Sequence, residues 1–460
     1  MRCLILACLA GTLCPLPLRA EVEVGRILVK NGIVFTLQAD ETQPRKGYLL
    51  AGDDGKILRV GYGDPPPGIR ATQTLDATGR FIVPGFVSAH SHIYQAATRG
   101  LASDKTLRGW LDASFPFWLT SPSDHYYETL SGCFDLLRHG ITTAFNFNDG
   151  SGKEGYDVEG FKAELGSGIR FVHGYCLPME GTRQSRRAAF EAFYAYTRPF
   201  SGKTAFLALA LGGYAFSAPD KDYILLEGEL MEKYGLFNQA HYLEAADPAQ
   251  VALQRSRFGW FKESGELGPR LSFGHLVHPD DSILAAIASS GAGMVWNPLS
   301  NGRLGSGLAD IPRIQKLGIR IGLGVDGQGS ADLSDPFENM RSGLYAIRSR
   351  YQDASILGVR DVLGFQTRGA ADVIGVSNRV GTLEKGKYAD FLVIDPHRMD
   401  TGPSFDPTAT LVLACSVANI EKVYVGARLV VENGSSLNPD STRAAAEVES
   451  RMARLRAARH

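Results

Sequence analysis

Apolar runs recur along the chain and alternate with stretches that mix hydrophobic and polar residues. Eight short runs have strand character: 81–90, 141–147, 169–177, 204–212, 236–243, 270–277, 293–298 and 319–326. Stretches that can hold a helix lie between them, among them 182–199, 219–234, 247–265 and 279–290. Strands that alternate with helices favour parallel βαβ units. Eight such units predict an α/β fold of the (β/α)8 TIM-barrel type, with an open doubly wound sheet as the alternative.

Both flanks of this pattern resemble β-hairpins joined by Gly, Asn and Asp turns. The hairpin-like stretches are 26–37, 47–61, 389–396 and 420–434. We expect one small β-sandwich domain, built from residues 21–83 and 385–437, beside a barrel of residues 84–384. The tail, residues 438–460, predicts a solvated amphipathic helix.

The first twenty residues differ from the rest of the chain. An early Arg, an apolar stretch, prolines and then Ala20 are typical of a secretory signal peptide spanning 1–20. A mis-assigned start or a buried helix is the competing interpretation. Export would place the protein in the periplasm or outside the cell.

Three cysteines follow the predicted signal peptide: Cys133, Cys176 and Cys415. They are widely spaced and predict neither a disulfide framework nor a cysteine metal cluster.

Composition narrows the class of partner. The chain has 460 residues, of which 44% are hydrophobic and 21% charged, and its net charge is −1. This balance gives no reason to expect nucleic acid as a partner. After residue 20 no apolar span is long enough to cross a membrane. We therefore expect a small-molecule substrate, and the sequence leaves the oligomeric state open, a homo-oligomer included.

Polar residues stand where several of the apolar runs end. The first run ends on His90 and His92, whose side chains share a face because strand positions i and i+2 point the same way. Later runs end on His241, His275 and Asp326. Since all strands of a barrel open at their carboxyl ends onto one face, these residues should converge there.

Three imidazoles and a carboxylate suit a divalent transition metal, with Zn²⁺ as the expected ion and an open position for water. Such an ion lowers the pKa of its water to about 7, which supplies hydroxide at neutral pH. Glu244, past the strand that carries His241, is the candidate proton shuttle. His275 could bind the ion or polarise the water. The fourth run has no lysine at its end to bridge two metals, so one ion per chain is expected.

The other histidines are harder to place. His278 could belong to the site or not. We expect His125, His139 and His173 at the surface or at helix ends, together with His397 and His460.

Several segments, in order, resemble the amidohydrolase superfamily, in the branch of cytosine, guanine and S-adenosylhomocysteine deaminases and triazine hydrolases. They include VPGFVSAHSH, AHYLEA, FGHLVHPDD, WNPLSNGRLGSGLADI and IGLGVDGQGS, and HIYQAATRG followed by WL looks most like the 8-oxoguanine deaminases. The resemblance implies a barrel with a terminal β-sandwich and one Zn²⁺ or Fe²⁺.

The same resemblance assigns roles to individual residues. It makes His90, His92, His241 and Asp326 the metal ligands, and gives proton transfer and water activation to Glu244, His275 and Asp326. Gln95 stands where guanine deaminases carry a substrate-contacting Gln. One position departs from the family: Trp296 replaces the usual His, and we expect its indole near a flat substrate ring.

Together these features predict a metal-dependent hydrolase that cleaves a non-peptide C–N bond. The most direct reaction is deamination of a nitrogen heterocycle such as a purine, pyrimidine or triazine, by attack of metal-bound hydroxide. Two alternatives remain open. The same site could hydrolyse a chloro- or alkylamino-heterocycle or a linear amide, or the barrel could be a non-catalytic binding protein.

Overall fold

The computed structural model describes residues 23–39, 41 and 43–458. The predicted signal peptide lies outside these residues. Eight parallel strands form one sheet in strict chain order, from the first, β6, to the last, β13. They are β6 (Phe86–Ser91), β7 (Ile141–Asn148), β8 (Arg170–Tyr175), β9 (Phe206–Gly213), β10 (Asn238–Tyr242), β11 (Leu271–His275), β12 (Gly293–Trp296) and β13 (Arg320–Leu323). The predicted barrel is confirmed.

The first and last strands meet at their carboxyl ends. Just past β13, the backbone N–H of Asp326 donates to the carbonyl of His90 at 2.9 Å, and that of Val325 donates to Ser88 Oγ at 3.1 Å. These bonds bring β13 against β6. The interior is filled by alternate strand residues, among them Val87, Phe145 and Val295.

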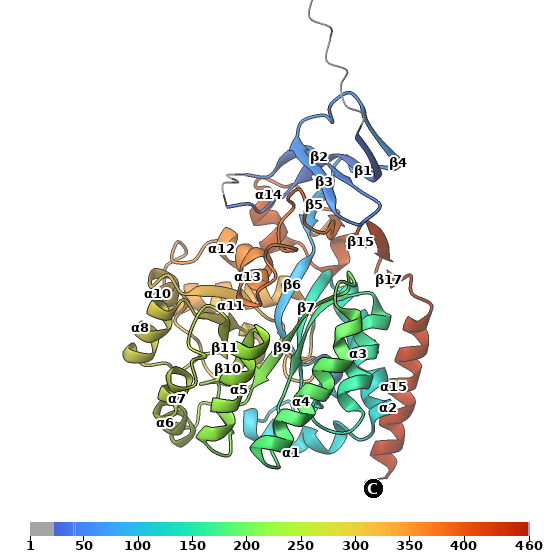
Figure 1. Ribbon diagram of the computed structural model, residues 1–460. Coiled ribbons are helices and arrows are strands. Elements are labelled where there is room, and N and C mark those ends of the chain that lie inside the picture. The colour runs from blue at the N-terminus through green and yellow to red at the C-terminus, as the bar shows by residue number, and fades with distance from the viewer. Residues whose placement is uncertain (1–22, 40, 42, 459–460) are drawn as a thin grey trace, which may run out of the picture.

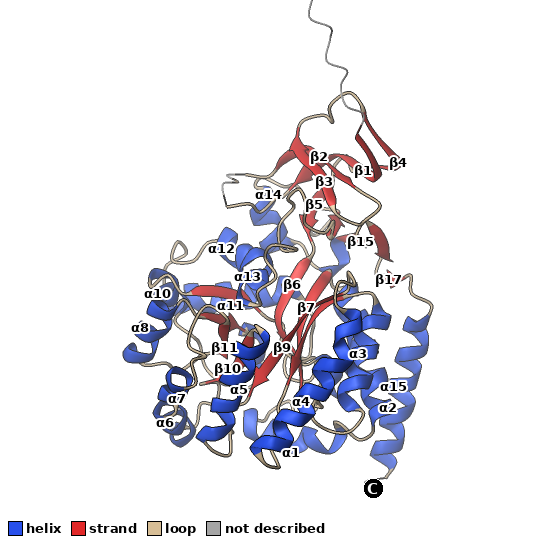
Figure 2. Cartoon of the chain, viewed as in Figure 1, coloured by secondary structure: helices blue, strands red, loops and turns tan. Residues whose placement is uncertain are grey.

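Helices surround these strands (Figures 1 and 2). They include α1 (Leu107–Ser114), α2 (Pro122–Arg138), α3 (Tyr156–Ser167), α4 (Arg183–Thr197), α5 (Lys221–Tyr234), α6 (Pro248–Ser256), α7 (Phe258–Glu263), α8 (Asp281–Ser290), α9 (Pro298–Arg303), α10 (Ile311–Lys316), α11 (Pro336–Tyr351), α12 (Val359–Gly364) and α13 (Ala370–Val373). Local sequence sets their ends. Asp220 caps the first turn of α5, and Gly235 ends that helix with φ of 66°. The stretch predicted as one helix, 247–265, is two, because the chain breaks at Arg257.

The chain termini join in a second, mixed sheet of nine strands, shown above the barrel in Figure 1. It contains β1 (Glu23–Val34), β2 (Arg45–Ala51), β3 (Ile57–Tyr62), β4 (Ile69–Asp76), β5 (Phe81–Pro84), β14 (Phe391–Ile394), β15 (Ile420–Val425), β16 (Arg428–Glu432) and β17 (Ser435–Ser436). The antiparallel pairing of β5 with β14 joins the two halves. The first apolar run therefore serves two sheets, since it divides at Gly85 into β5 and β6.

The C-terminal helix α15 (Asp440–Ala457) lies along α2, as Figure 1 shows. Its Ala444 and Met452 are buried, and Arg451 Nη1 pairs with Asp124 Oδ1 at 2.5 Å. The helix is amphipathic as predicted, but one face is docked on the barrel. Within the described residues, no helix combines the length and apolarity needed to cross a membrane.

Candidate metal centre

The strand ends bring the predicted histidines and aspartate together at the carboxyl end of the barrel. His90 Nε2 lies 3.5 Å from Asp326 Oδ1, and His92 Nε2 lies 3.7 Å from the same oxygen. His92 Nε2 and His241 Nε2 are 3.1 Å apart. Two groups of potential ligand atoms result, His90 with His92 and His241, and His90 with His275 and Asp326. All of these side chains are buried.

These residues fit a metal ion. Tetrahedral Zn²⁺ with bonds of about 2.1 Å places neighbouring ligand atoms about 3.4 Å apart, which is close to the separations seen here. Among the described residues, His90 Nε2 finds no hydrogen-bond partner although it is fully buried. A buried polar atom without a partner is costly unless a ligand satisfies it. The donor set therefore suits one divalent ion.

Outer partners fix the orientation of two imidazoles. His90 Nδ1 lies 2.5 Å from Gln239 Oε1, and Gln239 Nε2 donates to the carbonyl of Ala89 at 2.7 Å. His92 Nδ1 lies 2.6 Å from Asp149 Oδ2. In both rings Nδ1 is engaged, which leaves Nε2 directed at the cluster. Sequence reasoning missed Gln239 and Asp149.

Backbone geometry also shapes the site. His275 and Asp326 have positive φ, 68° and 60°, in the left-handed region that costs energy for residues other than glycine. Gly324 lets the chain pass close to His90, because a Cβ there would lie 2.7 Å from His90 Cβ. The GLGVDG segment, residues 322–327, thus packs directly against His90.

Electrostatics prepares three histidines as neutral donors. Burial lowers the pKa of His90 to about 4 and that of His275 to about 3. Burial and the neighbouring imidazoles keep the pKa of His241 well below its usual value. His92 differs: burial acts to lower its pKa, but the charges of Asp149 and Asp326 outweigh it and raise the pKa to about 9. The carboxylates around His92 thus favour positive charge on this imidazole.

The two carboxyl groups have opposite tendencies. Burial acts to raise the pKa of Asp326, but the imidazoles of His275, His90 and His92 hold it at about 2. Burial and then the charge of Asp326 raise the pKa of Glu244 to about 8. Glu244 Oε1 lies 3.6 Å from His275 Nδ1. At neutral pH the site therefore combines an ionised Asp326 with a Glu244 that can hold a proton.

A model of the amidohydrolase family matches residues 81–430, most of the chain. The chain belongs to the amidohydrolase family. Membership confirms both the resemblance and the predicted enzyme class, a hydrolase.

Named relatives of this amidohydrolase span nearly its whole length. It is 26% identical, over 94% of its chain and 99% of the relative, to the 5-methylthioadenosine/S-adenosylhomocysteine deaminase of Symbiobacterium thermophilum. An adenosine deaminase from Xanthomonas campestris with bound zinc superposes with a TM-score of 0.86 at 20% identity, over 95% and 99% of the two chains. A mutant of atrazine chlorohydrolase TrzN from Arthrobacter aurescens TC1, complexed with zinc and atraton, superposes with a TM-score of 0.82 at 22% identity, over 92% and 99%. Both structures share this amidohydrolase's fold.

Gln95 lies beside the cluster on the 3-10 helix η1 (Ile93–Thr98). Its side chain is buried, and its Oε1 has no hydrogen-bond partner in the described part of the chain. Gly327 makes room for it, because a Cβ at that position would lie 1.9 Å from Gln95 Oε1. The amide oxygen thus lies against Gly327, the residue that follows Asp326, as an acceptor without a donor among the described residues.

Trp296 lies elsewhere. In β12, Val295 belongs to the barrel interior, so Trp296 points the other way, into the layer between strands and helices. A Cβ on Gly343 of α11 would come within 2.5 Å of its ring. The indole fills the space under α11 and has no place in the substrate site proposed below.

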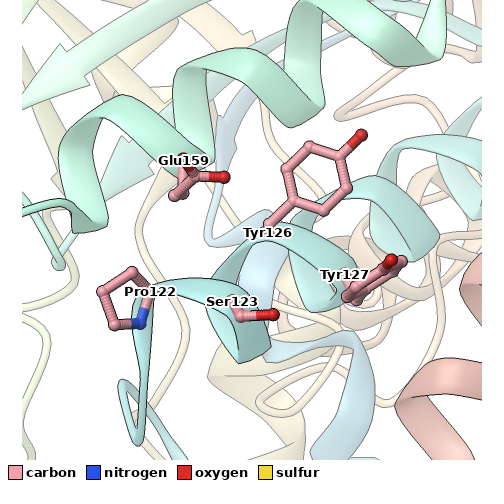
Figure 3. Close-up of a pocket in the computed structure, with 5 residues that line it drawn as sticks. All are labelled: Pro122, Ser123, Tyr126, Tyr127 and Glu159. Atoms are coloured by element: carbon pink, nitrogen blue, oxygen red, sulfur yellow. The ribbon is translucent and has the colours of Figure 1, made fainter.

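Three other histidines are held by partners away from the cluster. His278 Nε2 lies 2.7 Å from the carbonyl of Ser306. His125, in the first turn of α2, and His173, within β8, are fully buried, and both contact Asn148. The expectation of a surface or helix-end position is therefore wrong for His173. The hollow drawn in Figure 3 lies between α2 and α3, where Tyr126, Tyr127 and Glu159 line it with Pro122 and Ser123, and it contains none of the clustered residues.

Proposed function

We propose that this amidohydrolase removes an exocyclic amino group from a nitrogen heterocycle by hydrolysis, with release of ammonia. The observation that carries the proposal is the placement of Glu244 beside the buried cluster, 3.6 Å from His275. C–N cleavage requires the departing nitrogen to gain a proton, and a carboxyl group that can hold and return one is the group this step needs.

We infer that His90, His92, His241 and Asp326 hold a single Zn²⁺, with Fe²⁺ as the alternative. When bound, such an ion would lower the pKa of a water molecule and polarise the carbon–nitrogen system under attack. The zinc in the two structural neighbours supports this inference.

The chain's own residues would then move protons and orient the ring. Glu244 would deliver a proton to the nitrogen that leaves. Asp326, ionised at neutral pH, and His275, neutral at that pH, would accept and hold a proton beside the attacked carbon. Gln95 Oε1 would accept a hydrogen bond from an N–H group of the substrate. Water and amine are thereby converted to the ring carbonyl or its hydroxyl tautomer and ammonia.

The relatives guide the choice of ring. The sequence relative is named for adenine-containing substrates and a structural neighbour for adenosine. An adenine nucleoside with an exocyclic amino group is therefore the first substrate class to test, followed by other purines, pyrimidines and triazines.

The test is ammonia release by the Zn²⁺-loaded full-length protein across these classes, with the H241A variant as the control for metal dependence. Release from at least one aminated ring, lost in H241A, is the expected result. If the metal-loaded protein releases chloride or alkylamine but never ammonia, the proposed leaving group is wrong.

A further inference from the structure

Asp149 stands directly after β7, the neighbour of β6, which carries His90 and ends just before His92. Its Oδ2 lies 2.6 Å from His92 Nδ1, and the same oxygen accepts a hydrogen bond from the hydroxyl of Tyr94 at 2.7 Å. Tyr94 is buried and Asp149 is mostly so. We propose that Asp149, held by Tyr94, is a positioning residue that sets the tautomer and orientation of His92 for metal binding.

This inference rests on the proposed metal site. Its first step concerns the tautomer. An ionised carboxylate can only accept, so His92 must donate from Nδ1. The lone pair of Nε2 is then directed away from Asp149, towards His241 Nε2 at 3.1 Å and Asp326 Oδ1 at 3.7 Å. A metal-binding imidazole commonly donates its other N–H to a carboxylate in this way, which fixes the ring and raises its basicity.

The second step is the contrast with His90. That imidazole also has its Nδ1 engaged, but its partner is the amide oxygen of Gln239, which carries no net charge. The two histidines of the HSH segment thus have different partners, one neutral and one anionic. Asp149 therefore adds a negative charge near the cluster that Gln239 does not, and its loss should affect cation binding more.

The third step is the role of Tyr94. Its ring packs edge-on against Trp118 with centroids 5.8 Å apart, inside a small buried cluster that also contains Trp110. This packing fixes the phenol, and the phenol fixes Asp149. Tyr94 is thus a link between the aromatic cluster and the carboxylate that orients His92.

The chain offers a matched control. Glu164 and His173 form a second carboxylate–imidazole pair, with Oε2 and Nδ1 2.7 Å apart and both side chains fully buried. The other ring nitrogen of His173 faces the Asn148 amide at 3.3 Å, so this imidazole presents no free nitrogen to the cluster. Removing Glu164 should therefore cost stability without weakening metal binding.

The experiment measures the Zn²⁺ dissociation constant of the full-length protein by competition with a chromogenic chelator. The variants are D149A, D149N, D149E, Y94F, E164Q and H241A. Loss of a partner behind a ligand weakens metal binding by about 10–100-fold, and we expect this for D149A. The Zn²⁺ affinity of D149N should lie between those of D149A and wild type, because its amide oxygen still accepts from Nδ1. D149E should bind Zn²⁺ more tightly than D149A but less tightly than wild type. Y94F should change it only a few-fold.

A second measurement separates positioning from folding. The visible spectrum of Co²⁺-loaded protein reports coordination geometry, and it should change in D149A but not in E164Q. If D149A binds Zn²⁺ like wild type while H241A does not, the role of Asp149 is wrong and the metal site stands. If E164Q loses as much affinity as D149A, the effect is general destabilisation and the role is again wrong. If wild type binds no stoichiometric Zn²⁺, the metal site and this inference fall together.

Discussion

Two buried charged clusters lie at opposite ends of the barrel strands, and they differ in how completely their atoms are paired. At the amino end, Arg170 begins β8 and forms a bidentate pair with Asp390 of the terminal sheet, at 2.6 and 3.0 Å. Asp390 also accepts from the backbone N–H of Gly426, and the guanidinium lies 3.6 Å from the centre of the Tyr388 ring.

At the carboxyl end, the cluster of His90, His92, His241, His275 and Asp326 is not saturated. His90 Nε2, His241 Nδ1 and Gln95 Oε1 have no hydrogen-bond partner among the residues that the structure describes. Burial is equally deep at both ends, so depth alone does not identify a functional site. The paired cluster joins the terminal sheet to the barrel, whereas the unpaired one keeps buried polar atoms available to a ligand.

The sharpest test of this difference is Glu244→Gln. Glutamine keeps the size of the side chain but cannot exchange a proton, so turnover should fall by about 10³-fold, within the range for a general acid or base. The free energy of unfolding and the bound metal should stay unchanged. Ammonia release and metal analysis check this. Glu232→Gln, at an exposed ion pair with Arg270, is the surface control. Activity within tenfold of wild type would remove Glu244 from the proposed mechanism.

Arg170→Met should instead lower the free energy of unfolding and leave the carboxyl-end cluster intact. It leaves Asp390 buried without its partner, and breaking a buried pair costs about 3–5 kcal/mol. Urea unfolding should show this loss, while metal affinity per folded molecule is unaffected.

The double variant R170M/D390L is the control for Arg170→Met. Because it removes both charges, it should recover part of the lost stability. A loss below about 1 kcal/mol in R170M would mean that the pair does not fasten the two sheets.

Zn²⁺ should raise the free energy of unfolding by binding to the cluster at the carboxyl end of the barrel. A ligand that binds only the folded state adds about 2.7 kcal/mol when its free concentration is 100 times its dissociation constant. The gain should be present in wild type and in R170M, and absent in H241A. Unfolding curves with and without Zn²⁺ measure it. An equal gain in H241A would show that zinc binds outside the cluster.

The sequence predicted which residues converge at the carboxyl end of the barrel, because each stands near the end of an apolar run and barrel geometry brings such ends together. It could not predict Asp149 or Gln239. Asp149 follows β7 in a segment that reads as a turn, and its partner His92 is 57 residues away. Gln239 lies within β10, 149 residues from His90. Asp149 reaches His92 because β7 lies beside β6, whereas Gln239 reaches His90 across the barrel, because β10 is four strands from β6 in the sheet order.

Strand alternation explains the misplacement of Trp296. The side chain was expected near a substrate ring because the family resemblance places the usual His at this position, but a shift of one residue along a strand reverses the face. The burial of His125 and His173 was not predicted either. Their shared partner, Asn148, lies 23 and 25 residues away from them along the chain.

A third kind of buried charge gives the most gradual predicted effect, one that is spread over several pH units. Glu128 on α2 is fully buried, and neither carboxyl oxygen has a hydrogen-bond partner within the described residues. Burial, and then the charge of Asp124, raise the pKa of Glu128 to about 8, although Arg451 opposes them. Unlike the residues at either end of the barrel, Glu128 has no ion-pair partner and no neighbouring cluster of metal-binding groups within the described residues, and its raised pKa favours the protonated form.

The sign of the pH effect follows from this. The unfolded chain releases the Glu128 proton near pH 4.5, whereas the folded protein keeps it until about pH 8. Between these values the folded state binds more protons, so the contribution of Glu128 to stability falls as pH rises, by at most about 1.4 kcal/mol per pH unit. Glu128→Gln should remove that fall. Urea unfolding of both proteins at pH 5.5, 6.5 and 7.5 measures the difference. Parallel curves would mean that Glu128 is ionised in the folded state and that a cation or water pairs with it, which would place it with the two charged clusters instead.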